Sequence, residues 1–359
     1  TDASNTTAQV LKQGEVQGSD VAAHSAGVLD IKTTILPDAD ALFLTAIDRY
    51  GHELWRWTFP VNKLNQANEV LSPLSNKVTS TETENELTVK AKNHTFIFSK
   101  KDGQLKGVSV NNRKISFANG PRFIGARRAD RSLDQFYNHD DEKAKEKDRT
   151  YSEFPDAAVF TKLDVKEDGG NLIVTADYKL GNLDKVQWTI NPNGEAVLDY
   201  TYNFSGVVDL MGICFDYPED QVISKRWLGA GPYRVWQNRI HGTQYDVWEN
   251  DYNDPIPGET FTYPEFKGYF GSVSWMNIRT KEGTISLTNE TPDAYIGVYQ
   301  PRDGRDRLLY TLPKSGISVL NVIPPVRNKV NSTDLCGPSS QPKWVNGPQS
   351  GRIIFRFME

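Results

Sequence analysis

The stretch that decides the fold is Leu172–Tyr202, L-I-V-T-A-D-Y-K-L-G-N-L-D-K-V-Q-W-T-I-N-P-N-G-E-A-V-L-D-Y-T-Y. Many of its apolar residues recur at every second position, which is the period of a half-buried β-strand and not of a helix. The pattern predicts three strands, Leu172–Leu180, Lys185–Asn191 and Ala196–Tyr202, separated by turn residues such as Asn193-Gly194. We therefore expect antiparallel β-structure here.

The same β-pattern extends toward the N-terminus, where it predicts strands at Glu86–Lys92, Thr95–Ser99, Gly107–Val110 and Ala158–Val165. Helical periodicity is nearly absent from this part of the chain. Residues 86–359 hold too many strands for a seven-stranded sandwich. The sequence therefore predicts an all-β fold, a large antiparallel β-supersandwich of two stacked sheets with a concave face.

Residues 1–62 form a separate predicted unit. Strands are expected at Gly27–Leu36, Ala41–Arg49 and His52–Val61, with a turn at Pro37-Asp38-Ala39-Asp40 between the first two. So few strands make an incomplete immunoglobulin-like sheet, which either adds to another sheet or has partner strands outside this sequence. Residues 63–85 are polar and without sustained periodicity, so they are interpreted as a linker.

Composition excludes several classes of function. The chain has 359 residues, 38% hydrophobic and 24% charged, with a net charge of −5 and scattered basic residues, so no nucleic-acid partner is expected. No apolar run is long enough to cross a membrane, and no membrane partner is expected. The charge run Asp140–Arg149 is typical of a solvated loop or short helix.

The sequence has two cysteines, Cys214 and Cys336, which are too few for a disulfide scaffold. Two buried free thiols are favoured over one bridge between them.

A tryptophan-rich block, Trp227–Ile278, combines aromatic rings with Asn, Asp, Glu, Arg and His side chains. This mixture suits pyranose recognition, because a ring face can stack on the C–H face of a sugar while planar polar groups bind its hydroxyls. The alternative is that the tryptophans are core residues of a β-sandwich. Both interpretations apply to Trp227, Trp236, Trp248 and Trp275.

Four segments carry a resemblance to a known family. Trp227–Tyr233 with Asn238-Arg239 matches a W-x-G followed by G-R-G-P…(D/N)-R, and Tyr263–Gly268 matches a (Y/F)-P-x-E-x-G-like stretch; weaker matches are Lys100–Leu105 and Gly120-Pro121. The chain resembles the C-terminal region of β-galactosidase-like enzymes of glycoside hydrolase family 2. That region comprises the end of the immunoglobulin-like domain 4 and the small-chain domain, whose fold is galactose-mutarotase-like.

The resemblance implies a non-catalytic C-terminal portion of a glycoside hydrolase that shapes the active-site cleft and contacts carbohydrate. Two loops depart from the family. Ala126–Leu133 stands in place of W-R-A-P-T-D-N-D, and Cys336–Gln341 in place of G-G-D-x-S-W. The resemblance implies that both loops face the active site of the catalytic barrel. Their divergence argues against authentic β-galactosidase specificity.

No catalytic residue is predicted. Retaining glycosidases need two carboxylates about 5 Å apart, and in this family both stand on a barrel of alternating strands and helices, which this chain lacks. One of the two family carboxylates stands in an Asn-Glu motif. This sequence has Asn-Glu pairs at 68–69, 85–86 and 289–290, and their match to that motif is interpreted as coincidence. The missing catalytic barrel is therefore an expected partner. Carbohydrate is the other expected partner, either a galactoside or another plant or host glycan.

The opening T-D-A-S-N-T-T suggests a mature product or excised fragment, and a periplasmic or secreted location is expected.

Two weaker sites are alternatives within the same block. His241 and Glu265 offer a candidate acid–base pair for aldose-epimerase-like chemistry. Glu249–Asp254 could supply oxygen ligands to a divalent or sodium ion, although it lacks EF-hand spacing. The sequence otherwise predicts no cofactor and no metal. An independent carbohydrate-binding module and a structural brace, including one in a homo-oligomer, are the alternative functions.

The carbohydrate site is expected on the concave face. If Tyr233–His241 is extended, Trp236 and Asn238 share one face and Arg239 takes the other. The run after Trp248 is expected to be a loop, because it is polar and contains two prolines. The predicted carbohydrate-binding residues are Trp236, Asn238, Arg239, His241, Trp248, Asn250, Asp251, Asn253, Asp254 and Glu265.

Overall fold

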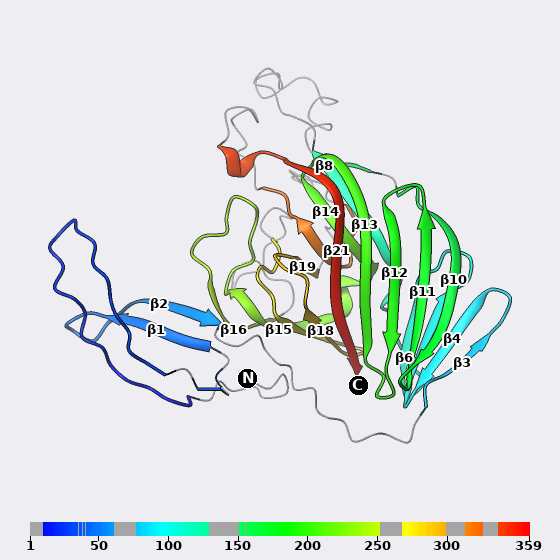
Figure 1. Cartoon of the computed structure of the whole chain (residues 1–359), viewed down its shortest axis with the longest axis horizontal. Helices are drawn as coiled ribbons and strands as arrows, with labels where there is room; N and C mark the ends of the chain where they lie inside the picture. The colour runs from blue at the N-terminus through cyan, green and yellow to red at the C-terminus, as the bar shows by residue number, and fades with distance from the viewer. Residues whose placement is uncertain are drawn as a thin grey trace, which may run out of the picture. The chain divides into compact units, whose positions relative to one another are not determined.

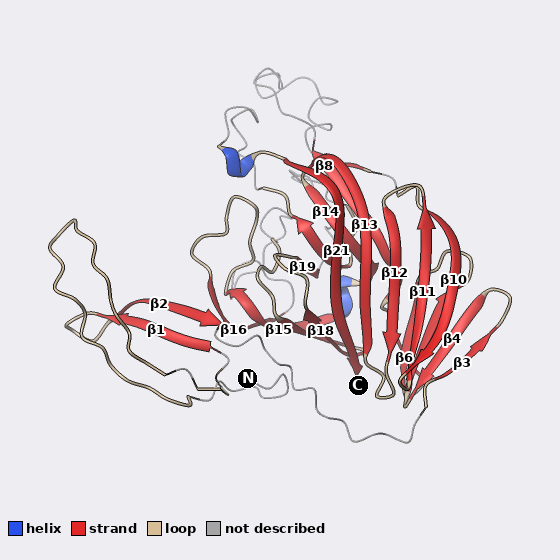
Figure 2. Ribbon diagram, viewed as in Figure 1, coloured by secondary structure: helices blue, strands red, loops and turns tan. Residues whose placement is uncertain are grey.

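The structure, a computed structural model, describes residues 10–60 apart from 35, 38 and 40, then 77–128, 151–251 apart from 155, 268–298, 313–325 and 337–359. The chain divides into two compact units, Thr1–Ser72 and Pro73–Glu359. Figure 1 follows the chain by colour, and Figure 2 shows that strands make up most of the regular structure.

The described part of the first unit contains one hairpin, in which β1 (Ala41–Ile47) pairs antiparallel with β2 (Glu53–Pro60). Its turn is held by the Asp48 carboxylate, which accepts the backbone N–H groups of Tyr50 and His52, each at 2.8 Å. The hydrogen bond from the His52 backbone is the main reason why the pKa of Asp48 lies below its usual value. The strand predicted at Gly27–Leu36 is wrong, because the described residues there form no strand. A β-pattern without a paired neighbour does not hold an extended segment in a sheet.

The second unit consists of two antiparallel sheets. The nine-stranded sheet has the order β10-β11-β12-β13-β21-β18-β17-β15-β16, and the ten-stranded sheet has the order β19-β20-β14-β8-β6-β5-β4-β3, with β7 paired to β6 and β9 paired to β8. This arrangement confirms the predicted all-β class of large antiparallel sheets.

The strands of the nine-stranded sheet are β10 (Val159–Asp168), β11 (Asn171–Lys179), β12 (Leu183–Ile190), β13 (Ala196–Val208), β15 (Val222–Gly231), β16 (Gln244–Asp251), β17 (Trp275–Thr280), β18 (Gly283–Asn289) and β21 (Lys343–Met358). Those of the ten-stranded sheet are β3 (Thr79–Glu82), β4 (Glu86–Ala91), β5 (His94–Ser99), β6 (Leu105–Val110), β7 (Arg113–Ile115), β8 (Ala118–Arg128), β9 (Tyr151–Glu153), β14 (Leu210–Asp216), β19 (Tyr295–Val298) and β20 (Ile317–Val322). Two short 3-10 helices are described, η1 (Glu219–Gln221) and η4 (Pro338–Ser340), and neither could span a membrane.

The seven strands predicted between residues 86 and 202 are confirmed as β4, β5, β6, β10, β11, β12 and β13. Residues 79–82, which the sequence assigns to the linker, instead form the edge strand β3, paired with β4.

The core lies between the two sheets. Alternate residues of β13 point into it, and Leu198 is fully buried. Phe215 on β14 of one sheet lies 5.7 Å from Phe355 on β21 of the other, measured between ring centroids, and Phe117 lies 4.5 Å from Phe215. Because every second residue of a strand faces inward, the remaining residues of β12, β13 and β21 form the outer face of the nine-stranded sheet.

Cys214 is a buried free thiol, as the sequence favours. Burial raises the pKa of this thiol to about 11, while the nearby Arg122 guanidinium acts in the opposite direction. Such a thiol is unreactive at neutral pH, because the thiolate is the nucleophile. Cys336 and the charge run Asp140–Arg149 lie outside the described residues.

Candidate functional site

Most of the tryptophans in the predicted sugar-binding block belong to the core. Trp227, Trp236 and Trp275 are 0%, 4% and 3% exposed. Trp236 packs edge-on against Tyr269 with ring centroids 5.7 Å apart, so it presents no ring face to a ligand. The core interpretation is therefore correct for these three side chains, and the predicted stacking role of Trp236 is wrong.

The segment that carries Trp236 is a tight turn and not an extended strand. The backbone carbonyl of Trp236 accepts the N–H of Arg239 at 2.8 Å. The predicted alternation of faces therefore does not apply. Within and after the turn, Asn238 is half-buried, whereas Arg239 and His241 are exposed.

This turn is joined to residues 337–341, which include η4. The Gln237 side-chain amide donates to the carbonyls of Ser339 at 2.9 Å and Gln341 at 2.7 Å. The Asn238 amide donates to the Ser340 hydroxyl at 2.9 Å. We call residues 236–239 and 337–341 together the loop junction.

Trp248, Asn250 and Asp251 lie on β16, so the predicted loop does not begin directly after Trp248. Trp248 is half-buried, and its indole N–H donates to the Gln244 carbonyl at 3.1 Å. The Asn250 Oδ1 atom is buried and has no hydrogen-bond partner among the described residues, while Asp251 is exposed at the end of the strand.

The remaining predicted residues, Asn253, Asp254 and Glu265, lie outside the described residues, so only His241 of the predicted His241–Glu265 pair is described. Within the described part of the chain, no group of three or more His, Cys, Asp or Glu side chains could hold a metal ion. The proposed ion site at Glu249–Asp254 is described only as far as Asp251.

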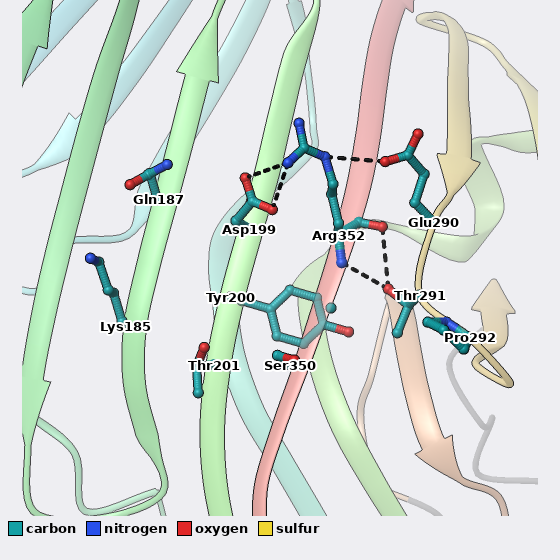
Figure 3. A pocket seen from close by; sticks show the side chains of 11 residues that line it. Lys185, Gln187, Asp199, Tyr200, Thr201, Glu290, Thr291, Pro292, Ser350 and Arg352 are labelled. Atoms are coloured by element: carbon teal, nitrogen blue, oxygen red, sulfur yellow. Dashed lines mark hydrogen bonds and ion pairs between the residues drawn. The ribbon is translucent and has the colours of Figure 1, made fainter. Parts of the chain in front are cut away.

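A pocket of about 410 Å³ opens at the nine-stranded sheet, over β12, β13 and β21 (Figure 3). We call it the sheet pocket. Most of its polar side chains come from the outward positions of these strands, and the rest from the segment that follows β18. Its lining residues are Lys185, Gln187, Asp199, Tyr200, Thr201, Glu290, Thr291, Pro292, Ser350, Gly351 and Arg352.

Arg352 occupies the middle of the sheet pocket, between two carboxylates (Figure 3). Its Nη1 atom lies 3.2 Å and 3.4 Å from the carboxylate oxygens of Asp199, and its Nε atom lies 3.1 Å from Oε2 of Glu290. The three charged groups come from β13, β21 and the residue that directly follows β18. These ion pairs are partly exposed and contribute little to stability, but they hold the guanidinium in a defined orientation.

The sheet opens here because β18 leaves β21. The last ladder pair joins Asn289 to Ile353. Two residues after Asn289, the Thr291 hydroxyl accepts the N–H of the adjacent β21 residue Arg352 at 2.9 Å and donates to the Arg352 carbonyl at 3.2 Å. The Arg352 carbonyl also accepts the backbone N–H of Glu290 at 3.0 Å, so the Thr291 hydroxyl and the Glu290 backbone together satisfy the backbone of Arg352.

Tyr200 lies beneath this opening. Burial raises the pKa of its phenol to about 12, an effect that the Thr291 hydroxyl partly offsets. Among the described residues the Tyr200 hydroxyl makes no hydrogen bond of ordinary geometry. Gly351 leaves room for it, since a Cβ atom there would lie 2.3 Å from the hydroxyl oxygen.

The sequence does not single out the sheet pocket. Strand alternation could have placed Lys185, Gln187, Asp199 and Thr201 on one face, because all four lie in predicted strands. Glu290 and Arg352 are far away in sequence and outside those strands. Only the pairing of β13 with β21 brings Arg352 to Asp199.

Two stacked antiparallel sheets with a polar pocket at the open face of one of them place the second unit among the β-supersandwich domains. The chain belongs to the beta galactosidase small chain family, whose model matches residues 90–326. This match confirms the resemblance to the small-chain domain. Comparison with curated proteins gives no match.

Solved structures similar to this chain include a galactose 1-epimerase from Lactobacillus acidophilus, with 10% identity, a TM-score of 0.43, and coverage of 79% of this chain and 99% of the epimerase. A second is an aldose epimerase homologue from C. elegans, with 8% identity, a TM-score of 0.35, and coverage of 78% and 99%. A third is a putative mutarotase from Salmonella typhimurium, with 10% identity, a TM-score of 0.36, and coverage of 80% and 95%.

Proposed function

We propose that this chain is the non-catalytic C-terminal portion of a β-galactosidase-like glycoside hydrolase of family 2, where it shapes the active-site cleft and contacts carbohydrate. The observation that carries the proposal is the small-chain family match over residues 90–326. Its catalytic partner is a barrel that supplies the two catalytic carboxylates.

The loop junction supports a role in shaping the cleft. Residues 236–239 belong to the block that carries the family resemblance, and residues 337–341 replace a loop that the resemblance directs toward the barrel. Three side-chain hydrogen bonds from Gln237 and Asn238 join these two segments. A wall built from two mutually bonded loops is more rigid than either loop alone, and a rigid wall positions substrate better.

The test is reconstitution with a catalytic barrel of a family 2 enzyme, either supplied separately or joined to this chain. We expect the barrel to turn over a nitrophenyl glycoside faster in the presence of the chain. A Gln237→Ala, Asn238→Ala double variant should lower kcat/KM at least tenfold, which corresponds to about 1.4 kcal/mol, because it removes three hydrogen bonds of about 1 kcal/mol net each and part of that loss reaches the cleft.

The matched control is Lys100→Ala, which removes a surface ion pair with Glu82 in the ten-stranded sheet. This variant should leave kcat/KM unchanged. The proposal is contradicted if adding the chain does not change the turnover of the barrel, or if the double variant gives the same turnover as the unaltered chain.

The second candidate function is carbohydrate binding by this chain on its own. The sheet pocket is the observation that favours it, because its polar lining is open to solvent without any catalytic domain.

A further inference from the structure

We propose that the outer face along β21, from Trp344 to the sheet pocket at Arg352, binds a neutral oligosaccharide. This inference rests on the proposed function and deepens it, because it assigns a substrate class and a second contact surface apart from the loop junction. We call this surface the β21 strip.

The residues of the β21 strip share one face of the sheet. The β13–β21 ladder runs without a register shift, pairing Trp344 with Val207, Asn346 with Ser205, and Arg352 with Asp199. The Ser205 hydroxyl donates to the Asn346 side chain at 2.8 Å, and Arg352 is ion-paired with Asp199. Since side chains alternate along a strand, Trp344 lies on this same face.

Trp344 is an exposed aromatic side chain, with 71% of its surface accessible. Tryptophan is normally well buried. Indole offers a flat apolar surface whose immobilisation costs little conformational entropy, since only two side-chain torsions are fixed. Because the C–H face of a pyranose ring is also flat and apolar, Trp344 forms a platform for a sugar at one end of the strip.

The sheet pocket supplies polar groups at the other end. Asp199 and Glu290 orient Arg352, and among the described residues the Nη2 atom of this guanidinium has no partner. The carboxylates retain lone pairs that can accept sugar hydroxyls. Both signs of charge are therefore held in place before a ligand arrives, which lowers the cost of binding.

Charge balance indicates that the ligand is neutral. Lys185 and Arg352 carry two positive charges, and Asp199 and Glu290 carry two negative charges, so the lining has no net charge. Arg352 is already paired with two carboxylates. A uronate or phosphate would have to displace them or lie beside them, and like charges at this range repel.

The length of the strip indicates an oligosaccharide. Trp344 and Arg352 are eight residues apart on one strand, which corresponds to about 26 Å at about 3.3 Å per residue. This span exceeds a single pyranose ring several-fold. The Trp344 end also lies three residues beyond Gln341 of the loop junction, so a chain leaving the proposed cleft could continue onto the strip.

The experiment measures binding of defined sugars to the full chain by isothermal titration calorimetry. The probes are galactose, galactotetraose, cellotetraose and mannotetraose, with tetragalacturonate as the anionic counterpart. We expect at least one neutral tetrasaccharide to bind more tightly than galactose. Trp344→Ala and Arg352→Ala should each weaken that tetrasaccharide at least tenfold.

The control is Arg356→Ala, because Arg356 lies on the same face of β21 and is ion-paired with Glu195 outside the sheet pocket. It should change affinity less than twofold. Asp199→Asn keeps the size of the side chain and removes its charge, so it tests the sheet pocket even if Arg352→Ala fails to fold. It should weaken the tetrasaccharide about as much as Arg352→Ala.

The inference is overturned if no neutral tetrasaccharide binds, if binding survives both Trp344→Ala and Asp199→Asn, or if tetragalacturonate binds most tightly. Reconstitution with the barrel gives a separate readout. If the chain activates the barrel but the β21 strip binds no sugar, only this inference is contradicted. If the strip binds sugar but the chain does not activate the barrel, only the proposed function is contradicted.

Discussion

At the scale of single residues, the contact between Tyr200 and Gly351 makes the sheet pocket sensitive to one added methyl group. A Cβ atom at position 351 would lie 2.3 Å from the Tyr200 hydroxyl and 2.7 Å from the Thr291 hydroxyl. We expect Gly351→Ala to lower the free energy of unfolding by about 1–3 kcal/mol, as other overpacked sites do. Urea unfolding followed by tryptophan fluorescence measures the change.

Two further variants identify the cause. Tyr200→Phe removes the hydroxyl and should recover part of the loss in the double variant, giving a non-additive cycle. Gly107→Ala is the matched glycine control, since Gly107 also lies in a strand and has no atom within 4 Å of its Cβ position. Equal losses at the two glycines would contradict the steric explanation.

Residue chemistry alone could not place the site. Trp236 has the right chemistry to stack on a sugar, but in the fold Tyr269 covers its ring. Trp344 lies outside the predicted block. It is nevertheless the exposed tryptophan on the outer face of the nine-stranded sheet, at one end of the β21 strip. Burial is a property of the whole packing arrangement, so the local composition around a tryptophan does not decide it.

At the scale of elements, the strands that alternate clearly could be predicted and the others could not. Every residue of β14 except Asp216 is buried, so the segment lacks period-2 polarity. The edge strand β3 has the sequence Thr-Ser-Thr-Glu, and all four residues are exposed, so it has no apolar signal. Gly27–Leu36 has the opposite problem, with a β-pattern but no partner strand among the described residues.

The elements should also differ in stability. β13 pairs with β21 along its whole length and buries Leu198 and Tyr202, whereas β1 and β2 pair only with each other among the described residues. We expect the β1–β2 amides to exchange with deuterium at least about a thousandfold faster than those of β13, because a lone two-stranded hairpin is marginally stable. Peptide-resolved mass spectrometry of the native chain checks this. Comparable protection in β1 and β13 would instead mean that the hairpin is covered.

At the scale of the whole molecule, the chain should have no glycosidase activity by itself. The sheet pocket contains two carboxylates, but both are paired with Arg352, and neither stands on a barrel that could position a glycosidic bond between them. We expect no turnover of nitrophenyl-galactoside or nitrophenyl-glucuronide above buffer. Turnover abolished by Asp199→Asn or Glu290→Gln would show that the chain is itself an enzyme.

The position of β21 has a consequence for biosynthesis. This strand, the last described in the chain, lies in the middle of the nine-stranded sheet, between β13 and β18. On the ribosome, β21 cannot join the halves β10–β13 and β15–β18 until its residues 353–355, which pair with both β13 and β18, have emerged from the exit tunnel. Both halves would meanwhile expose unpaired edges to chaperones and to neighbouring nascent chains. Premature termination before Lys343 would leave two separate half-sheets, and messages truncated there should yield aggregated product.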